Sequence, residues 1–329
     1  MNLRSLLFLF FTIVLSACVS TGAEDTSGDS SGVLAGASAE DEPLVSIAVE
    51  ELPIEITVPT STQPPAPMDI QETPLPTIRP TLSPEGWEYL PVIPVISQRA
   101  REIYLRGLDM GNRPNSFIKI GDCDATPTWF LGDFDQGPHL YSLGEYTELQ
   151  QTIDYFKGSF GRDSVAVRRG FNSASVLSPI WANSAECNKN ETPLDCEVRI
   201  QNPSIALLLI GTNDTHNPEQ FEPNLRKILD RLIERGILPI LSTKADNREA
   251  DHRINQVIAQ LAHEYDIPLW NFWLAIQPLP SQGLQEDGVH LTFAANHFND
   301  PARMKAAWPW RNLTALQVLD VARRELNKP

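Results

Sequence analysis

Short apolar runs alternate with amphipathic segments along the chain from about Glu85 to Pro329. This alternation constrains the fold most, because strands that alternate with helices favour a parallel sheet with helices on both faces. The runs are too short for helices, and most are rich in Val, Ile and Leu, as in strands buried on both sides. We expect strands at Phe117–Gly121, Val165–Arg168, Ile205–Ile210, Leu238–Leu241 and Pro268–Phe272.

The segments between these runs have the spacing of amphipathic helices. We expect helices at Ser97–Leu108, Glu222–Arg235, Glu249–Tyr265 and Leu313–Leu326. Ser97 is a suitable N-cap for the first helix, and Gly236 directly follows the second, where glycine commonly ends a helix. We therefore predict that residues 85–329 form one α/β domain with a doubly wound parallel sheet.

The N-terminus has the features of a secretory signal. Arg4 precedes the apolar run Leu6–Leu15, and the run ends in Leu-Ser-Ala-Cys at Cys18. This ending resembles a bacterial lipobox and makes residues 1–18 a lipoprotein signal peptide. The resemblance implies that the chain is cleaved before Cys18, which carries a lipid and becomes the mature N-terminus. The alternative is an ordinary signal peptide with a chance cysteine. No later run approaches the ~18 apolar residues of a spanning helix, so we predict anchoring to a membrane without spanning it.

Residues 19–84 are rich in Ser, Thr, Gly, Pro and acidic residues, and Arg79 is their one basic residue. Such a composition buries too little apolar surface to fold, so we predict a disordered tether that holds the domain off the membrane. The net charge of the chain is −16, and most of it lies in this tether. We therefore expect no nucleic-acid partner, since phosphate binding depends on Lys and Arg. From the N-terminal signal, we expect the chain to lie in the cell envelope, outside the cytoplasm.

The cysteines of the predicted domain divide into a pair and a single thiol. Cys187 and Cys196 flank a short polar segment, and in an oxidising compartment we expect them to form a disulfide. Cys123 is then the odd thiol, which raises the question of a function.

Three motifs follow or lie beyond the expected strands: Gly-Asp-Cys at 121–123, Gly-Thr-Asn-Asp at 211–214 and Asp-Gly-Val-His at 287–290. Together they resemble the SGNH (GDSL-type) hydrolases, a family of esterases and acyl hydrolases with Gly-Asp-Ser, Gly-x-Asn-Asp and Asp-x-x-His motifs. The resemblance covers roughly residues 115–295 and the final helix. It implies a three-layer, flavodoxin-like sheet, whose strand ends form the ligand crevice.

The resemblance also implies roles for individual residues. His290 would be the general base, Asp287 would orient it, and the side-chain amide of Asn213 would donate into the oxyanion hole. Spacing agrees, since Asp287 and His290 lie on one turn where the carboxylate can reach one ring nitrogen. The competing interpretations are an incidental histidine in a surface turn and an asparagine that merely turns the chain.

The remaining motif of the family is weaker here. A backbone N–H should complete the oxyanion hole in the segment after Val165–Arg168, and the register leaves Gly170 and Ser173 as alternatives. Asp122 and Asp214 are expected to brace their loops by hydrogen bonds.

Cys123 occupies the position of the nucleophilic serine, and this is the main departure from the family. A thiolate beside a histidine is a competent nucleophile for acyl transfer. Against this, sulfur is larger than oxygen, and a misplacement of ~1 Å can cost on the order of a hundredfold in rate. The alternatives are thiol-based hydrolysis, a weak or inactive site, and a sequence error or unforeseen role.

We therefore predict a surface-anchored ester or acyl hydrolase that uses Cys123, with an acylated glycan or a small lipid ester as substrate. The competing class is a catalytically weak or inactive module that binds such a ligand, and a weaker alternative is an envelope scaffold. We expect no cofactor and no metal, because the spacing of the His and Cys residues, His216 and His297 included, resembles no zinc site. Trp308 and Trp310 would stack on sugar rings if exposed, but core packing is the commoner explanation.

Overall fold

The computed structural model describes residue 83 and residues 86–328. The predicted signal peptide at 1–18, its Cys18 and all but one residue of the predicted tether at 19–84 lie outside the described residues. Among the described residues, no helix is both long enough and apolar enough to cross a membrane.

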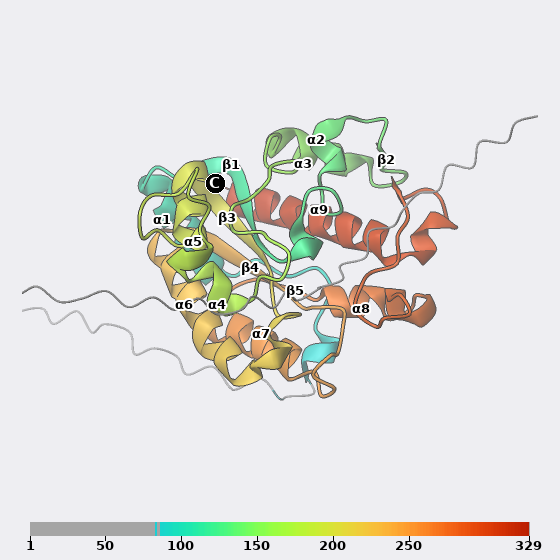
Figure 1. The fold of residues 1–329 in the computed structure, drawn as a ribbon. Helices are drawn as coiled ribbons and strands as arrows, with labels where there is room; N and C mark the ends of the chain where they lie inside the picture. The colour runs from blue at the N-terminus through green and yellow to red at the C-terminus, as the bar shows by residue number, and fades with distance from the viewer. Residues whose placement is uncertain (1–82, 84–85, 329) are drawn as a thin grey trace, which may run out of the picture. The chain divides into compact units, whose positions relative to one another are not determined.

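Helices and strands alternate as expected (Figure 1). The strands are β1 Arg113–Gly121, β2 Tyr141–Ser142, β3 Pro203–Leu209, β4 Leu238–Ser242, β5 Leu269–Trp270 and β6 Asn296–His297. The α-helices are α1 Gln98–Asp109, α2 Asp133–Gln136, α3 Gln150–Tyr155, α4 Ser173–Val176, α5 Pro193–Gln201, α6 Phe221–Glu234, α7 Arg253–Tyr265, α8 Phe272–Ile276 and α9 Ala307–Leu326.

The main sheet has four parallel strands in the order β1-β3-β4-β5. The strand expected at Val165–Arg168 is wrong, since this segment makes only an isolated parallel bridge between Val167 and Gly121 of β1. The N–H of Val165 donates to the buried carboxylate of Glu197 and that of Val167 to the Ser164 carbonyl, so the backbone turns instead of extending.

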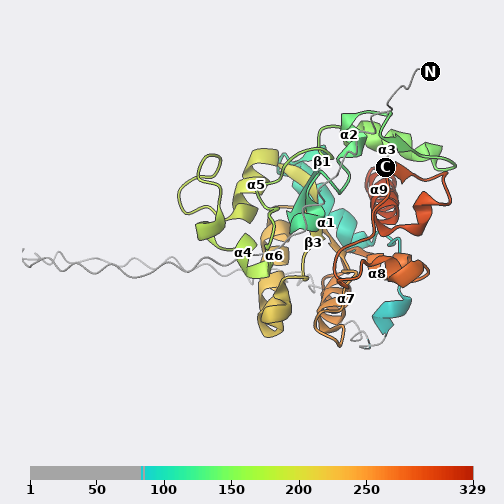
Figure 2. The ribbon, with the colours of Figure 1, turned by 45° about the vertical axis from the view of Figure 1, so that its right-hand side comes forward.

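The bridged segment nevertheless lies on the free side of β1. With it, the order at the sheet becomes segment-β1-β3-β4-β5, which is the flavodoxin-like order with its switch point at β1. Helices lie on both sides of the sheet, with α5 and α6 on one side and α1 and α9 on the other (Figure 2). The predicted three-layer α/β fold is confirmed.

The expected helix boundaries hold best where a cap defines them. The side chain of Ser97 accepts the N–H of Ala100 at 3.0 Å, as predicted for the N-cap of α1. Helix α7 begins at Arg253 rather than Glu249, because Glu249 forms a buried ion pair with Lys244 in the loop before the helix.

The last helix begins six residues earlier than expected. Its first turn contains Pro309, which is tolerated there because the first N–H groups of a helix have no intrahelical partner. Both faces of α9 are largely buried, so an amphipathic pattern is weak in its first half. Strand β5 is shorter than predicted, since Asn271 caps α8 directly after Trp270.

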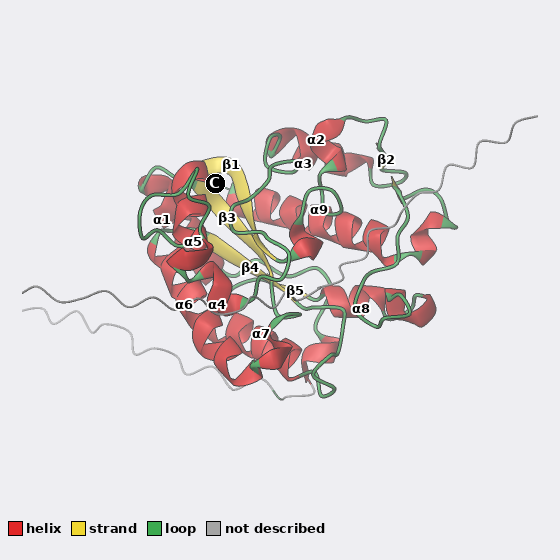
Figure 3. Cartoon of the chain, viewed as in Figure 1, coloured by secondary structure: helices red, strands yellow, loops and turns green. Residues whose placement is uncertain are grey.

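Two further segments frame the sheet (Figure 3). The stretch from β2 to α3 packs on α9, and β2 pairs with β6 in a small second parallel sheet. On the other side, the predicted disulfide between Cys187 and Cys196 is present and ties the loop before α5 to that helix.

Candidate active site

The turn after β1 presents Cys123 at the carboxyl end of the sheet. Gly121 ends the strand, and a Cβ atom built there would lie 2.4 Å from the carbonyl oxygen of Leu209, so only glycine lets β1 and β3 approach this closely. Asp122 then caps a short 3-10 helix, Cys123–Ala125, by accepting the N–H of Asp124 at 3.0 Å. Cys123 is half-buried in the first position of this helix.

Asn213 follows β3 and lies against the same turn. Its Nδ2 donates to Oδ2 of Asp122 at 3.0 Å and to the carbonyl of Phe171 at 3.0 Å. Asp122 therefore joins the turn of Cys123 to the turn of Asn213. In this arrangement both N–H groups of the Asn213 amide are already in use, so an incoming oxyanion must replace one of these acceptors.

The Asp122 carboxyl is buried, and its environment disfavours the charge. Burial, with the nearby charge of Asp124 as the next contribution, raises the pKa of Asp122 to about 7. The N–H of Asp124 and the more distant Arg311 act in the opposite direction. The brace between the two turns can therefore change protonation near neutral pH.

The two alternatives for the second oxyanion donor differ in the structure. The N–H of Ser173 donates to Asp214 Oδ1 at 3.0 Å, and the Ser173 hydroxyl donates to the same oxygen at 2.5 Å. Ser173 is fully buried and braces its loop, so its N–H, like the amide of Asn213, would have to release its present acceptor to serve an oxyanion. Gly170 lies in the preceding exposed turn with φ of 80°, a conformation that glycine adopts without strain, and both residues remain alternatives.

Asp214, like Asp122, is a buried carboxyl that braces a loop. Burial raises its pKa, and the hydrogen bonds from Ser173 oppose this rise. Both aspartates, for which a bracing role was predicted, accept hydrogen bonds that join their loops to neighbouring turns.

Asp287 and His290 form the pair that their spacing predicts. Nδ1–H of His290 donates to Oδ2 of Asp287 at 2.5 Å, and Oδ1 accepts the backbone N–H groups of Val289 and His290 at 2.9 and 3.0 Å. Partial burial opposes ionisation, but these hydrogen bonds outweigh it and lower the pKa of Asp287 to about 2. The ionised carboxylate fixes the ring and leaves Nε2 as the nitrogen for acid–base chemistry.

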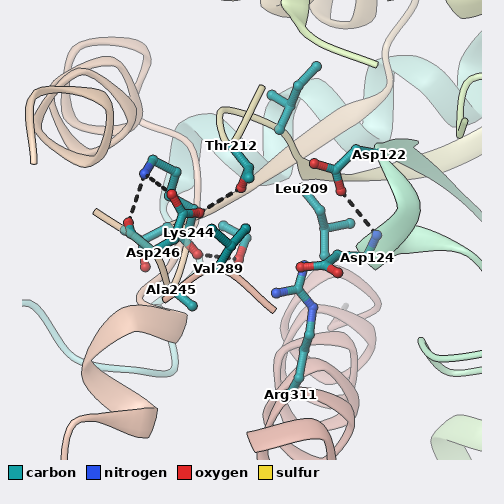
Figure 4. A pocket seen from close by; sticks show the side chains of 12 residues that line it. Asp122, Asp124, Leu209, Thr212, Lys244, Ala245, Asp246, Val289 and Arg311 are labelled. Atoms are coloured by element: carbon teal, nitrogen blue, oxygen red, sulfur yellow. Dashed lines mark hydrogen bonds and ion pairs between the residues drawn. The ribbon is translucent and has the colours of Figure 1, made fainter. Parts of the chain in front are cut away.

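A small pocket of about 10 Å³, the space of roughly one water molecule, brings the motifs together (Figure 4). Its lining contains Asp122 and Asp124, on either side of Cys123, Thr212, next to Asn213, and Val289, next to His290. The three motifs therefore converge on one region at the carboxyl ends of β1 and β3.

Electrostatic interactions connect the same groups. Burial raises the pKa of Asp124, while the charges of Arg311 and His290 oppose this rise. His290 and Asp124 are therefore close enough to interact, although Asp124 and Cys123 are neighbours in sequence and His290 is far along the chain.

Three charged residues of this region were not predicted from the sequence. Arg311 comes from α9, and Lys244 and Asp246 come from the loop after β4. Lys244 pairs with Asp246 at 2.8 Å, and Asp246 accepts the hydroxyl of Thr212 at 2.8 Å. The position of Arg311, directly after Trp310 and in a helix end that is largely buried, was the sequence signal that could have drawn attention to it.

One group of ligand-type side chains coincides with the site. Within the described part of the chain, Asp122, Cys123 and Asp124 lie close enough together to share an ion. Both oxygens of Asp122 already accept protein hydrogen bonds, from Asp124 and from Asn213. The geometry gives this trio a bracing role around the thiol, and we assign no metal to it.

Aromatic rings border the site on the side of α9. Trp308 is 5% exposed and packs in the core, as expected for the commoner alternative. It stacks on Trp129, which is 43% exposed, and Trp129 meets the 64% exposed Phe293 edge to face at 5.6 Å. Trp129 and Phe293, which follow Cys123 and His290 in sequence, form an exposed aromatic pair.

Residues 145–297 match the model of the GDSL-like Lipase/Acylhydrolase family. No curated protein matches the chain. Among solved structures, the chain is similar to a GDSL-like lipase from Bacteroides thetaiotaomicron, with 14% identity over 68% of this chain and 98% of that one and a TM-score of 0.39. The chain is also similar to a variant of an acetyl xylan esterase from Geobacillus stearothermophilus, with 14% identity over 62% of this chain and 94% of that one and a TM-score of 0.37.

The family match begins after the turn of Cys123, so it does not include that residue. It does include the other three residues expected in the reaction, which are Asn213, Asp287 and His290. The chain thus carries a domain that matches the GDSL-like lipase/acylhydrolase family.

Proposed function

We propose that the chain hydrolyses ester bonds with a Cys–His–Asp site. The observation that supports this most directly is the pocket at the end of β1 and β3, where residues adjoining Cys123, Asn213 and His290 line one space. The short bond between Asp287 and His290 supplies an oriented imidazole, which is what a thiol nucleophile needs beside it.

In the proposed reaction, His290 Nε2 takes the proton of the Cys123 thiol, and the thiolate attacks the ester carbonyl carbon. The C–S bond forms and the carbonyl π electrons move to oxygen. Collapse of this intermediate breaks the C–O bond, and the departing alkoxide receives the proton from His290. Water then attacks the thioester carbonyl carbon and gives a proton to His290. Collapse of this second intermediate breaks the C–S bond, the Cys123 thiolate takes the proton back from His290, and the carboxylic acid is released.

The oxyanion would accept hydrogen bonds from Asn213 and from the backbone N–H of Gly170 or Ser173. Asn213 can turn one N–H to the oxyanion by releasing either Asp122 or the Phe171 carbonyl, because it holds both at 3.0 Å. Release of Asp122 is easier when that carboxyl is protonated, since a neutral acid is a weaker acceptor than a carboxylate.

The substrate class we propose is an acylated glycan or a small lipid ester. The exposed pair of Trp129 and Phe293 supports a substrate with an apolar or ring-shaped face, since exposed aromatic rings bind such faces well.

We also propose that the chain is attached to a membrane through lipid on Cys18, outside the cytoplasm. The support is the Leu-Ser-Ala-Cys ending of the N-terminal apolar run. Expression with a radiolabelled fatty acid should label the chain, and Cys18→Ala should abolish the label and release the chain from the membrane. Unchanged labelling of Cys18→Ala would contradict the anchor.

The test of the proposed reaction is the hydrolysis of p-nitrophenyl acetate by the full chain under reducing conditions. Native chain, Cys123→Ala and Cys123→Ser should be compared at equal concentration. The proposal predicts turnover by the native chain and none above background by Cys123→Ala. Equal turnover by both would contradict it.

The alternative is a module that binds an acylated or glycan ligand without cleaving it. The observation in its favour is that both N–H groups of Asn213 are bound within the protein. Activity in Cys123→Ser but not in the native chain would favour this alternative, because it would show intact machinery around a nucleophile that no longer serves.

A further inference from the structure

Arg311 is a buried cation with no role in the reaction described so far. It lies beside the turn of Asp122, Cys123 and Asp124, which we call the nucleophile turn. It is 5% exposed and comes from α9, far in sequence from the three motifs. Its Nε–H has no hydrogen-bond partner among the described residues. Burying a guanidinium in this way is costly, so a specific arrangement of charges must justify its position.

The aromatic side chains around Arg311 fix its direction. Its guanidinium carbon lies 4.9 Å from the ring centre of Phe272, 5.5 Å from that of Phe130, 5.7 Å from that of Trp308 and 6.0 Å from that of Trp270. Rings at such distances attract a cation and limit its rotation. The side chain is therefore held toward the pocket, as Figure 4 shows, rather than toward solvent.

The groups that the guanidinium faces are those of the nucleophile turn. Burial lowers the pKa of Arg311, and the charges of Asp124, Asp122 and Cys123, followed by Asp246, oppose that fall. The thiol side chain is thus one of the negative groups that Arg311 acts upon when it is ionised.

The other cation of the pocket lining cannot take this part. Lys244 is held by the carboxylates of Asp246 at 2.8 Å and Glu249 at 2.7 Å, and these bonds turn it away from the nucleophile turn (Figure 4). His290, which Asp287 orients, also acts on Asp124 of this turn when it is protonated.

We propose that Arg311 is a positioning residue that stabilises the thiolate of Cys123 and offsets the negative charges of Asp122 and Asp124 around it. In a protein with serine at this position, such a cation would stabilise the nucleophile little, because the hydroxyl stays neutral before the reaction. Beside a cysteine it favours the ionised, nucleophilic form. This inference concerns the thiol of the proposed function, but it can stand even if no ester is hydrolysed.

The test is the pH profile of alkylation of Cys123 by iodoacetamide in the full chain. The modified Cys123 peptide is quantified by mass spectrometry, so that reaction at Cys18 is not counted. Arg311→Met removes the charge at similar length, Arg311→Lys keeps a charge, and Arg324→Met removes an exposed cation from the same helix as a matched control.

The proposal predicts that the midpoint of the Arg311→Met profile lies about one pH unit above the native one. Alkylation of this variant near neutral pH should then be roughly tenfold slower. Arg311→Lys should recover most of this difference, and Arg324→Met should match the native chain. A native-like midpoint in folded Arg311→Met, or equal shifts in the Met and Lys variants, would overturn the proposal.

The alkylation midpoint of the native chain provides a second test of the proposal if Arg311→Met does not fold. This midpoint must lie below the ordinary thiol value of about 8.5, and a midpoint at or above that value overturns the proposal without any variant. Failure of ester hydrolysis is a separate result. It would remove the proposed function while the Arg311-dependent midpoint remained.

Discussion

Nδ1–H of His290 donates to Oδ2 of Asp287 over 2.5 Å, while Oδ1 of the same carboxylate accepts two backbone N–H groups of that turn. Asp287 therefore holds both the ring and the loop that carries it. Asp287→Asn should keep the shape of the turn but favour the wrong tautomer of His290, and kcat for p-nitrophenyl acetate should fall on the order of a hundredfold. Asp251→Asn, at an exposed acid paired with Arg253, is the control and should leave kcat unchanged.

The pH dependence of this effect follows from the depressed pKa of Asp287, about 2. A carboxyl with such a pKa is charged at every higher pH, so its contribution is lost only as the pH falls through that value. The carboxyl of Asp287 should therefore stay ionised between about pH 4 and pH 8, and the NMR chemical shift of its carboxyl carbon should be constant over this range. A carboxyl signal that titrates within this range would contradict the assignment.

Asp122 shows the opposite linkage, because its pKa is raised to about 7. Between its ordinary value and about 7, the folded chain binds a proton that the unfolded chain does not, so this group lowers stability as the pH rises through that interval. Asp122→Asn removes the effect. Its unfolding temperature relative to the native chain should be higher near pH 8 than near pH 5. An unchanged or reversed difference would contradict the raised pKa.

The buried ion pairs of Lys244 should matter for stability. Its ammonium group bonds to Asp246 and Glu249, and all three side chains are nearly inaccessible. Lys244→Met leaves two carboxylates buried without their cation, and the free energy of unfolding in urea should fall by about 3–5 kcal/mol. Arg253→Met, which breaks an exposed pair, serves as the control and should have little effect. Equal effects of the two changes would show that burial is not what makes the pair important.

The disulfide between Cys187 and Cys196 should stabilise the fold without affecting the reaction. It closes a short loop before α5, and its loss should lower the free energy of unfolding by about 2–3 kcal/mol. The double change Cys187→Ser and Cys196→Ser should retain the kcat of the native chain, because no residue of this loop lines the pocket beside Cys123. Loss of activity in a variant that remains folded would contradict this separation.

The sequence predicted the parallel sheet well because its strands are buried on both faces and therefore stand out as apolar runs. It failed at Val165–Arg168, where the apolar residues are real but the side chain of Glu197 captures a backbone N–H that a strand would need. A hydrogen bond between segments 32 residues apart leaves no local signal.

The site was predictable to the extent that its residues lie in short motifs. The pair of Asp287 and His290 could be foreseen from its spacing together with the other motifs, since spacing alone also fits an incidental histidine in a surface turn. The bond from the N–H of Ser173 to Asp214 could not be foreseen, because the position of Asp214 depends on how β3 ends. Arg311 was missed because its neighbours in the site come from other parts of the chain, and only the packing of α9 brings them together.

The most direct measurement of the central claim is the search for an acyl group on Cys123. The full chain should be mixed with p-nitrophenyl acetate, quenched in acid within the first turnovers and digested for mass spectrometry. The proposed mechanism predicts an acetyl thioester on the peptide that contains Cys123, and none on that peptide in Cys123→Ala. Hydrolysis by the native chain with no acetyl group on Cys123 would contradict nucleophilic attack by this thiol. So would a Cys123→Ala variant that hydrolyses the ester and carries as much acetyl at another residue as the native chain carries at Cys123.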